Sequence, residues 1–436
     1  MSSQPYAFLN ANIIPMDAER VLANQTLIAQ NGRITQIGTA AQTPVPADAI
    51  QIDATDKYLL PALADMHIHL EGQAWNIMFP PQAQFSADDL DFEQILFSYL
   101  ANGITTVQVM SALPEHIALR DQIERGEIIG PRLILNRMID GPAQSWPPPI
   151  NTQVATPEEA RRVVRESKDM GYDGMKVYSF LQPDCYAAIL ATAHELDMPV
   201  IGHIPDALSV EHILASGQNL IAHAEEVMKH AKGDFSPERV EYFASLVADS
   251  DTWITPTLIT SRNILAIFDD LAAELARPEM EYLHPQAKGI WDYLINNMYL
   301  AMPPEHQAYI RRGFEDFQRP FTKALHDKGV KLMAGTDALI PTNTHGFSLH
   351  DELQELVGVG LTPFEALKTA TTHPWEYLGM FEIAVTIEVG KRTDLVLLNG
   401  NPLQDISNVE KVTGVMIKER WLNREDIQRR MSNLHY

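Results

Sequence analysis

The central part of the chain, from residue 58 to residue 382, alternates short apolar runs with longer amphipathic stretches. This alternation is typical of βαβ units that build a parallel sheet. Two of the amphipathic stretches, Pro157–Met170 and Pro183–Leu196, have helical spacing. Eight strands are predicted, at Leu59–His67, Ile104–Met110, Arg132–Arg137, Gly174–Tyr178, Val200–His203, Leu220–His223, Trp253–Pro256 and Lys331–Thr336. Eight such repeats over about 320 residues predict an α/β fold, a (β/α)8 TIM barrel.

The two ends of the chain show a different pattern, with short alternating runs and many turn residues. The N-terminal part has strands at Tyr6–Leu9, Thr26–Gln30 and Arg33–Ile37, and Asn31-Gly32 is a strong hairpin signal. After a predicted helix the pattern returns, with strands at Ile387–Val389, Asp394–Leu398 and Val412–Ile417. We therefore expect residues 1–57 and 383–436 to form one small β-sandwich domain beside a barrel domain of residues 58–382.

Two of the intervals between predicted strands are long. The segment Trp146–Pro149 (WPPP) predicts a rigid loop after the third strand. The interval Ser261–Gly329 is longer than one crossover helix needs and is rich in acidic and aromatic residues. It predicts two or three helices, which either cover part of the site or belong to the outer ring of the barrel.

Composition excludes several classes of function. The net charge of −24 argues against a nucleic-acid partner, because phosphate binding needs a basic surface. The single cysteine, Cys185, excludes an intrachain disulfide and a cysteine-rich zinc site. No basic and apolar leader is visible, and no run approaches ~18 apolar residues. We therefore expect a cytoplasmic protein that acts on a small molecule, with no membrane partner and with a homo-oligomer as an open possibility.

Residues that can bind a metal stand at the C-terminal ends of five predicted strands, where barrels carry their chemistry. His67 and His69 lie two residues apart after an apolar run, so both imidazoles of a strand would point to one face. Four later strands end with the other candidates, Lys176, His203, His223 and Asp337. Each one alone could be a core histidine, a surface lysine or a helix N-cap. Together they favour a metal site.

Lys176 is the unusual member of this set because it lies in an apolar strand, where an unpaired ammonium is costly. Burial lowers the pKa of a lysine, and the neutral amine can react with carbon dioxide. The resulting carbamate is a bridging carboxylate. Carbon dioxide is thus an expected partner of this residue.

The motifs that carry these residues resemble those of the amidohydrolase superfamily, in its imidazolonepropionase-like and prolidase-like branch. The resemblance extends over nearly the whole chain, through LLPALADMHIHL, NGITTVQVM, GEIIGPRLIL, YDGMKVY, VIGHIP, LIAHAEE, WITPTLI, AGTDA and FSLHDELQELVGVGLTPFEALKTATTHPWEYLG. The sequence departs from the family pattern at Ala62 and Ala64, before the His-x-His motif, and at Gln108-Val109 in the second strand.

The resemblance implies a binuclear centre. His67, His69 and Asp337 would hold one divalent ion, His203 and His223 the other, and carboxylated Lys176 would bridge them. Zinc is the commonest choice for hydrolysis, although manganese, iron and cobalt accept the same ligands. A metal-bridging hydroxide would attack the amide carbonyl, with Asp337 as general base and then general acid. The branch suggests a dipeptide or an N-acyl amino acid as substrate.

Four further residues are candidates for substrate binding. Tyr178 shares a strand face with Lys176 and could hydrogen-bond a substrate oxygen, or could be a core tyrosine. Arg262 follows the seventh strand and could pair with a substrate carboxylate, or could be a surface arginine. His345 and His350 follow the eighth strand near the barrel mouth, and His350 could instead orient the next helix.

Three alternatives stay open at this point. A mononuclear deaminase of the same superfamily would need a glutamate three residues after His203, where this chain has Asp206, and would leave Lys176 without a role. A hydrolase of cyclic amides or lactones would use the same metals. A non-catalytic barrel that serves as a scaffold would bind no metal.

Overall fold

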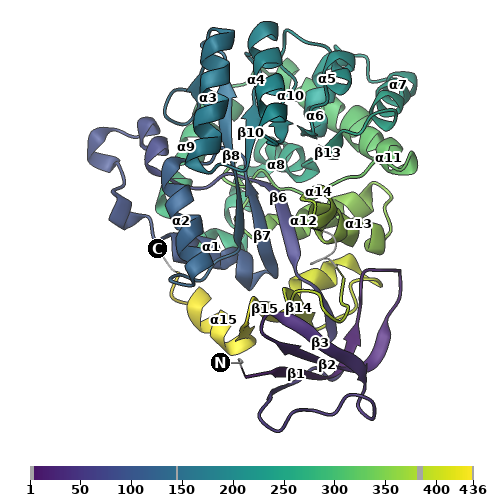
Figure 1. The fold of residues 1–436 in the computed structure, drawn as a ribbon. Helices are drawn as coiled ribbons and strands as arrows, with labels where there is room; N and C mark the ends of the chain where they lie inside the picture. Colours follow the sequence, from purple (N-terminus) through teal and green to yellow (C-terminus); the bar gives the residue numbers. More distant parts are fainter. Residues whose placement is uncertain (1–3, 144–145, 381–385, 435–436) are drawn as a thin grey trace.

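The computed structural model describes residues 4–143, 146–380 and 386–434. A barrel of parallel strands occupies its centre, and a separate mixed sheet lies below it (Figure 1). Seven parallel strands follow one another around the nearly closed barrel, in the order β13-β12-β11-β10-β8-β7-β6. Their bounds are β6 (Leu63–Ile68), β7 (Ile104–Val109), β8 (Arg132–Asp140), β10 (Gly174–Val177), β11 (Val200–Gly202), β12 (Leu220–Ala222) and β13 (Trp253–Thr255), and the short β9 (Thr152–Gln153) pairs with β8. The predicted barrel is confirmed.

The eighth strand predicted at Lys331–Thr336 does not form as a regular strand. This segment closes the barrel through isolated contacts: the N–H of Met66 donates to Ala334 O at 2.9 Å, and the N–H of Met333 donates to Ile254 O at 3.0 Å. The backbone passes very close to its neighbours here. A Cβ added to Gly335 would lie 2.7 Å from the Cβ of His67 in β6, so this close approach requires glycine.

The first predicted strand, Leu59–His67, is two strands in the structure. Its beginning, β5 (Tyr58–Pro61), pairs with β14 (Leu395–Leu398) and β1 of the lower sheet, and only β6 enters the barrel. The chain passes directly from one sheet to the other at Ala62, whose N–H donates to Asp394 O at 2.9 Å. One apolar run therefore serves two cores, which an apolarity pattern alone does not separate.

Both chain ends contribute to the lower sheet, as predicted. Its strand order is β16-β15-β14-β5-β1-β2-β3, with β4 beside β1. The purple N-terminal strands and the yellow C-terminal strands meet there in Figure 1. The remaining bounds are β1 (Tyr6–Ile13), β2 (Leu22–Gln30), β3 (Arg33–Thr39), β4 (Ile50–Asp53), β15 (Val412–Ile417) and β16 (Arg420–Asn423). Asn31 and Gly32 both have positive φ, as the predicted β2–β3 hairpin requires.

The C-terminal region differs from the prediction in detail. The predicted strand Ile387–Val389 is not a strand, whereas β16 and the helix α15 (Arg424–Met431) follow where nothing was predicted. The predicted domain boundary between residues 382 and 383 lies outside the described residues. A short 3₁₀ turn, η7 (Ile406–Glu410), connects β14 to β15.

Helices surround the barrel and bury one apolar core with its strands. α3 shows why they form: Thr156 caps its N-terminus by accepting the N–H of Glu159, Pro157 opens it, and Gly171 ends it with φ of 93°. The outer helices are α1 (Phe92–Ala101), α2 (Pro114–Arg125), α3 (Pro157–Met170), α4 (Pro183–Glu195), α5 (Val210–Ser216), α6 (Ala224–His230), α7 (Pro237–Ala248), α12 (Ser348–Gly358), α13 (Pro363–Ala370) and α14 (Thr372–Tyr377). Within the described residues, no helix has both the length and the apolarity to cross a membrane.

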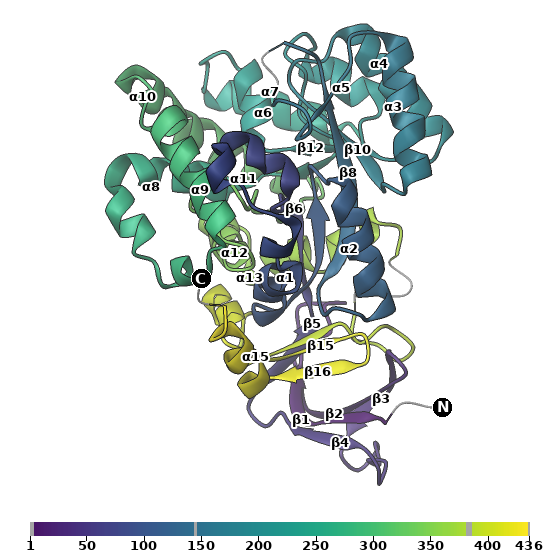
Figure 2. The ribbon, with the colours of Figure 1, turned by 90° about the vertical axis from the view of Figure 1, so that its left-hand side faces the viewer.

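The long interval after β13 forms a group of helices at one side of the barrel (Figure 2). Four α-helices form where two or three were predicted, and two of them continue into single π-helical turns. The bounds are α8 (Leu258–Leu275), η4 (Pro278–Tyr282), α9 (Pro285–Leu294), η5 (Ile295–Tyr299), α10 (Pro304–Gly313), η6 (Phe314–Gln318) and α11 (Arg319–Asp327). We call this segment, residues 258–327, the helical insertion. The loop with η1 (Gln73–Met78), η2 (Pro81–Ala83) and η3 (Ala87–Asp89) packs against α9 through η1.

Candidate metal centre and substrate cavity

The predicted metal ligands converge at the C-terminal end of the barrel strands. The Nε2 atoms of His67 and His69 lie 3.2 Å and 3.1 Å from the same Oδ1 atom of Asp337. The ring of His67 also lies 4.5 Å from that of His223, which in turn lies 5.1 Å from that of His203, between centroids. Three potential ligand atoms, one from each of His67, His223 and Asp337, all lie within 4.8 Å of one another. The strand ends thus gather these side chains into one buried cluster.

Lys176 reaches the same cluster from β10. Its residue is only 1 % exposed, and burial lowers the pKa of its ammonium to about 8. The neighbouring strand makes room for its stem, because a Cβ added to Gly202 would lie 2.6 Å from Lys176 Cδ and 2.4 Å from Val177 O. A buried lysine with a lowered pKa is the form that carboxylation requires.

The outward nitrogens of three of the histidines are held by neighbouring side chains. A partner on Nδ1 orients the ring and leaves Nε2 to face the cluster. The contacts are His69 Nδ1 with Ser111 Oγ at 2.6 Å, His223 Nδ1 with Thr257 Oγ1 at 2.7 Å, and His203 Nδ1 with Ser179 Oγ and Glu226 Oε1, both at 3.1 Å.

The donor chemistry of the cluster fits a divalent metal. His67 is fully buried; within the described residues its Nδ1 has no hydrogen-bond partner, and its Nε2 faces the Asp337 carboxylate. Burial lowers the pKa of His67 to about 3, so its imidazole is neutral and can donate a lone pair. Burial alone would raise the pKa of Asp337, but His223 and His67 outweigh it and hold that pKa well below its usual range. Neutral imidazoles around a buried carboxylate are a preferred donor set for zinc and similar ions.

The backbone is strained at the same place. Asp337, His223 and Thr257 are not glycines, yet their φ angles are 56°, 73° and 46°. Such left-handed conformations cost energy and persist where the surrounding structure holds them, frequently at functional sites. For Asp337, the hydrogen bond from its N–H to His67 O, at 2.7 Å, is one of these restraints.

A cavity of about 370 Å³ opens directly above the cluster. His69, Lys176, His203, His223 and Asp337 all contribute to its lining, so a ligand in the cavity would contact them. The helical insertion contributes many of the other lining residues, from α8, α9, η5, α10 and η6. The insertion therefore borders the cavity, as the sequence suggested for part of it.

Comparison with known proteins decides the family. The amidohydrolase family model matches residues 58–422, which is most of the chain. The chain belongs to the amidohydrolase family. It is accordingly a hydrolase that acts on carbon–nitrogen bonds.

Solved structures share the fold of this amidohydrolase over nearly its full length. A putative prolidase from Bifidobacterium longum superposes with a TM-score of 0.71 at 23% identity, covering 99% of both chains. A Xaa-Pro dipeptidase with bound methionine superposes with a TM-score of 0.73 at 21% identity, covering 96% of this chain and 100% of the dipeptidase. The ochratoxinase of A. niger superposes with a TM-score of 0.70 at 18% identity, covering 96% of each chain. None of the curated protein sequences matches the chain.

Tyr178 is the one candidate substrate residue that lines the cavity of this amidohydrolase. Its ring stacks on that of His203, with centroids 4.0 Å apart. Its hydroxyl oxygen accepts a hydrogen bond from Trp146 Nε1 at 3.2 Å, so its own proton is available for another acceptor. Tyr178 thus both packs against His203, a candidate metal ligand, and presents a donor to the cavity.

His345 and His350 lie behind the cavity rather than in its lining. His345 contacts Glu71 Oε2 through Nε2 at 3.1 Å and the Tyr99 hydroxyl through Nδ1 at 2.7 Å. His350 donates from Nε2 to Asn102 O at 3.0 Å. Both side chains are buried, and their contacts connect the segment after Asp337 to α1 and to the loop after β6.

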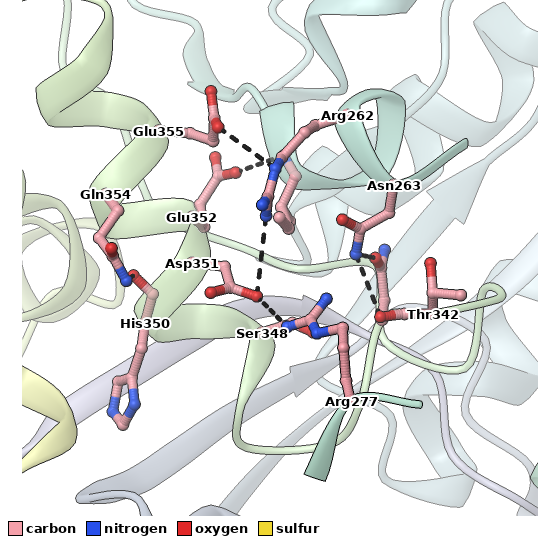
Figure 3. A network of polar contacts seen from close by, with 12 residues as sticks. Arg262, Asn263, Arg277, Thr342, Ser348, His350, Asp351, Glu352, Gln354 and Glu355 are labelled. Atoms are coloured by element: carbon pink, nitrogen blue, oxygen red, sulfur yellow. Dashed lines mark hydrogen bonds and ion pairs between the residues drawn. The ribbon is translucent and has the colours of Figure 1, made fainter. Parts of the chain in front are cut away.

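Arg262 points away from the cavity, toward α12. Figure 3 shows its guanidinium directed at acidic side chains of that helix. Its Nη1 lies 3.9 Å from Asp351 Oδ2, its Nε lies 3.6 Å from Glu355 Oε1, and its side chain is 44% exposed. The ion pairs hold α8 beside α12, and the structure places Arg262 outside the residues that line the cavity.

Sequence reasoning missed the residues that orient the histidines. Ser111 follows β7, Thr257 follows β13 and Glu226 follows β12. Each of them therefore comes after a different strand from the one that positions the histidine it contacts. Polar residues of these types are common after strands, so nothing local marks them. Their role depends on which strand ends become neighbours.

Proposed function

We propose that this amidohydrolase cleaves an amide or peptide bond at a binuclear divalent-metal centre, with zinc as the expected metal. The supporting observation is the convergence of three buried imidazoles with lowered pKa values, those of His67, His203 and His223, and of Lys176, with its lowered pKa, around one carboxylate. Carboxylated Lys176 would lie between the two ions. The other ligands would be His67, His69, His203, His223 and Asp337.

The residues of the site support the hydrolysis of a carbonyl compound. When bound, two divalent ions activate a water and polarise a carbonyl. Asp337 is ionised and lies at the centre of the cluster, so its carboxylate can take a proton from the attacking water and pass it to the leaving nitrogen. The Tyr178 hydroxyl can donate a hydrogen bond to the substrate carbonyl oxygen.

A dipeptide or an N-acyl amino acid fits the dimensions of the cavity. At ~30 Å³ for each water molecule, 370 Å³ corresponds to about a dozen waters, and because covalently bonded atoms each need less space, at least a dozen non-hydrogen atoms fit. Lys229 lines the cavity, its side chain is 40% exposed, and its ammonium lies 2.6 Å from Glu226 Oε1 and 3.5 Å from Glu225 Oε1. The third N–H of this ammonium can donate to a polar end of the substrate. Structural neighbours described as a Xaa-Pro dipeptidase and a putative prolidase are consistent with this class.

Metal content tests the proposal. Protein prepared with zinc and bicarbonate should hold two ions for each chain, and Lys176→Ala should lose at least one. Lys168→Ala, which removes an exposed lysine of α3, is the matched control and should keep both ions. One ion in the parent, unchanged in the Lys176→Ala variant, would argue instead for a mononuclear deaminase.

Turnover is then measured on dipeptides, N-acyl amino acids and lactones. The expected result is hydrolysis of the first two classes by metal-loaded protein and its loss in the Lys176→Ala variant. Hydrolysis of lactones alone would contradict the amide assignment. A protein that binds no metal under any of these conditions would favour the scaffold alternative. The cytoplasmic location stays a prediction.

A further inference from the structure

The walls of the cavity are apolar above the metal ligands. Trp75 and Trp146 form an edge-to-face pair with ring centroids 5.9 Å apart, and Trp75 meets the ring of His69 edge-on at 6.5 Å. Trp75 belongs to a buried cluster of aliphatic and aromatic side chains that is separate from the barrel core. The metal-site histidine is therefore bordered by aromatic surface.

The helical insertion extends this apolar wall. Leu294 ends α9, Met298 lies in the π-helical turn η5, and Met302 follows it. All three line the cavity. Methionine side chains are unbranched and adapt to irregular apolar shapes, and single π-helical turns are frequent at functional sites. The insertion thus presents a deformable apolar surface to whatever occupies the cavity.

Charged groups are few on these walls. Apart from the metal-ligand set, the charged Asp, Glu, Lys and Arg side chains that line the cavity in the described part of the chain are Glu225 and Lys229. They lie 3.5 Å apart, and Lys229 also bonds the buried carboxylate of Glu226. This small cluster can receive one polar end of a substrate. The part of the wall formed by Leu294, Met298 and Met302 carries no side-chain hydrogen-bonding group, so it recognises apolar surface.

We propose that the substrate carries a bulky apolar group of roughly six carbons on at least one side of the scissile amide, with Leu294, Met298 and Met302 as its subsite. This inference rests on the proposed amide hydrolysis and narrows its substrate class. The cavity has room for at least about a dozen non-hydrogen atoms. The amide and a terminal carboxylate use about half of them, which leaves space for a group of this size.

Two substrate series test the subsite on metal-loaded protein. One is N-acyl-L-alanine with acetyl, butanoyl, hexanoyl, octanoyl and decanoyl groups, and the other is N-acetyl-alanine, N-acetyl-leucine and N-acetyl-phenylalanine. Burial of a methylene contributes about 0.8 kcal/mol, or about fourfold in kcat/KM. We expect kcat/KM to rise by roughly 250-fold, at about fourfold for each added methylene, along one series up to about six carbons, and then to fall as the cavity is exceeded.

Two variants test whether the preference for bulky apolar substrates arises at the proposed subsite. Met298→Asn should lower the ratio of kcat/KM for the preferred long substrate to that for the acetyl substrate by about tenfold, because a polar amide replaces apolar contact surface. Leu300→Asn, two residues further on and outside the cavity lining, is the matched control and should leave that ratio unchanged. Met298 is 42% exposed and Leu300 is 45% exposed, so neither change should unfold the protein.

The outcomes separate the subsite from the proposed function. Equal kcat/KM across both series would overturn the subsite while amide hydrolysis stands. Absence of turnover on every amide would count against the function, and calorimetric binding of N-hexanoyl-L-alanine and N-acetyl-phenylalanine against N-acetyl-L-alanine would then decide the subsite. Tighter binding of a bulkier compound, weakened in the Met298→Asn variant, supports it; equal binding of all three refutes it.

Discussion

Glu226 connects His203, a proposed metal ligand, to Lys229 in the cavity wall, and its replacement by glutamine tests that connection. Its residue is 1% exposed, and its Oε1 lies 3.1 Å from His203 Nδ1 and 2.6 Å from Lys229 Nζ. Its Oε2 accepts the N–H of Ile204 at 3.1 Å. The carboxylate therefore favours a proton on Nδ1 of His203 and leaves the Nε2 lone pair toward the other ligand residues.

The size of the effect follows from these contacts. Glu226→Gln keeps the shape of the side chain but removes the charge that faces His203. A hydrogen bond to a charged group contributes about 1.5–3 kcal/mol, which corresponds to about 10- to 150-fold in an equilibrium constant. Loss of a group that orients a metal ligand typically costs about 10- to 100-fold in metal affinity. We expect the zinc Kd of the His203 site to rise by about 10- to 100-fold.

Competition with a chelator of known affinity measures this change, with zinc counted by elemental analysis. Glu225→Gln is the matched control, because its carboxylate is adjacent in sequence and 3.5 Å from Lys229 but does not contact His203. The control should keep the parent Kd. Thermal unfolding of both variants checks that the fold is intact. Parent-like affinity in folded Glu226→Gln, or an equal loss in both variants, would refute the orienting role.

Three further changes test other parts of the structure. Gly202→Ala would place a methyl group 2.6 Å from Lys176 Cδ, at a residue whose φ is 119°. We expect this variant to lose its metal and its unfolding free energy, measured by urea titration, to fall by about 1–3 kcal/mol. Gly379→Ala is the control, because at φ 67° with no atom near its Cβ it introduces only the backbone strain, and it should keep its metal. Burial lowers the pKa of His373 to about 4, below its usual 6.5, so the unfolded chain binds more protons between these values. The contribution of neutral His373 to the unfolding free energy is complete above pH 6.5 and is lost as pH falls toward 4, by at most about 3 kcal/mol. In His373→Asn, the midpoint of urea unfolding should therefore depend less on pH over this window than in the parent. Arg262→Ala should change kcat/KM by less than about twofold, because its ion pairs are partly exposed and lie outside the cavity; a tenfold loss would restore a role in substrate binding.

The sequence by itself determined the barrel and which candidate metal ligands its strand ends bring together. Alternation of apolar strands with amphipathic helices admits few arrangements, and parallel strands in a barrel bring their C-terminal ends together. His67, Lys176 and Asp337 could therefore be grouped although they are far apart in the chain. Period-two spacing also placed Tyr178 on the same face as Lys176, and the structure has it in the cavity lining.

Only the tertiary structure decided how that set is held and what surrounds it. The partition of one apolar run into β5 and β6 depends on which sheet each half meets, and the irregular passage through Gly335 depends on how closely β6 approaches it. The partners of the histidine Nδ1 atoms, such as Glu226, and the apolar wall from the helical insertion, such as Met298, are contacts between segments distant in sequence. Hydrophobic periodicity reports the environment of one element at a time, so contacts that depend on how elements are juxtaposed leave no local pattern.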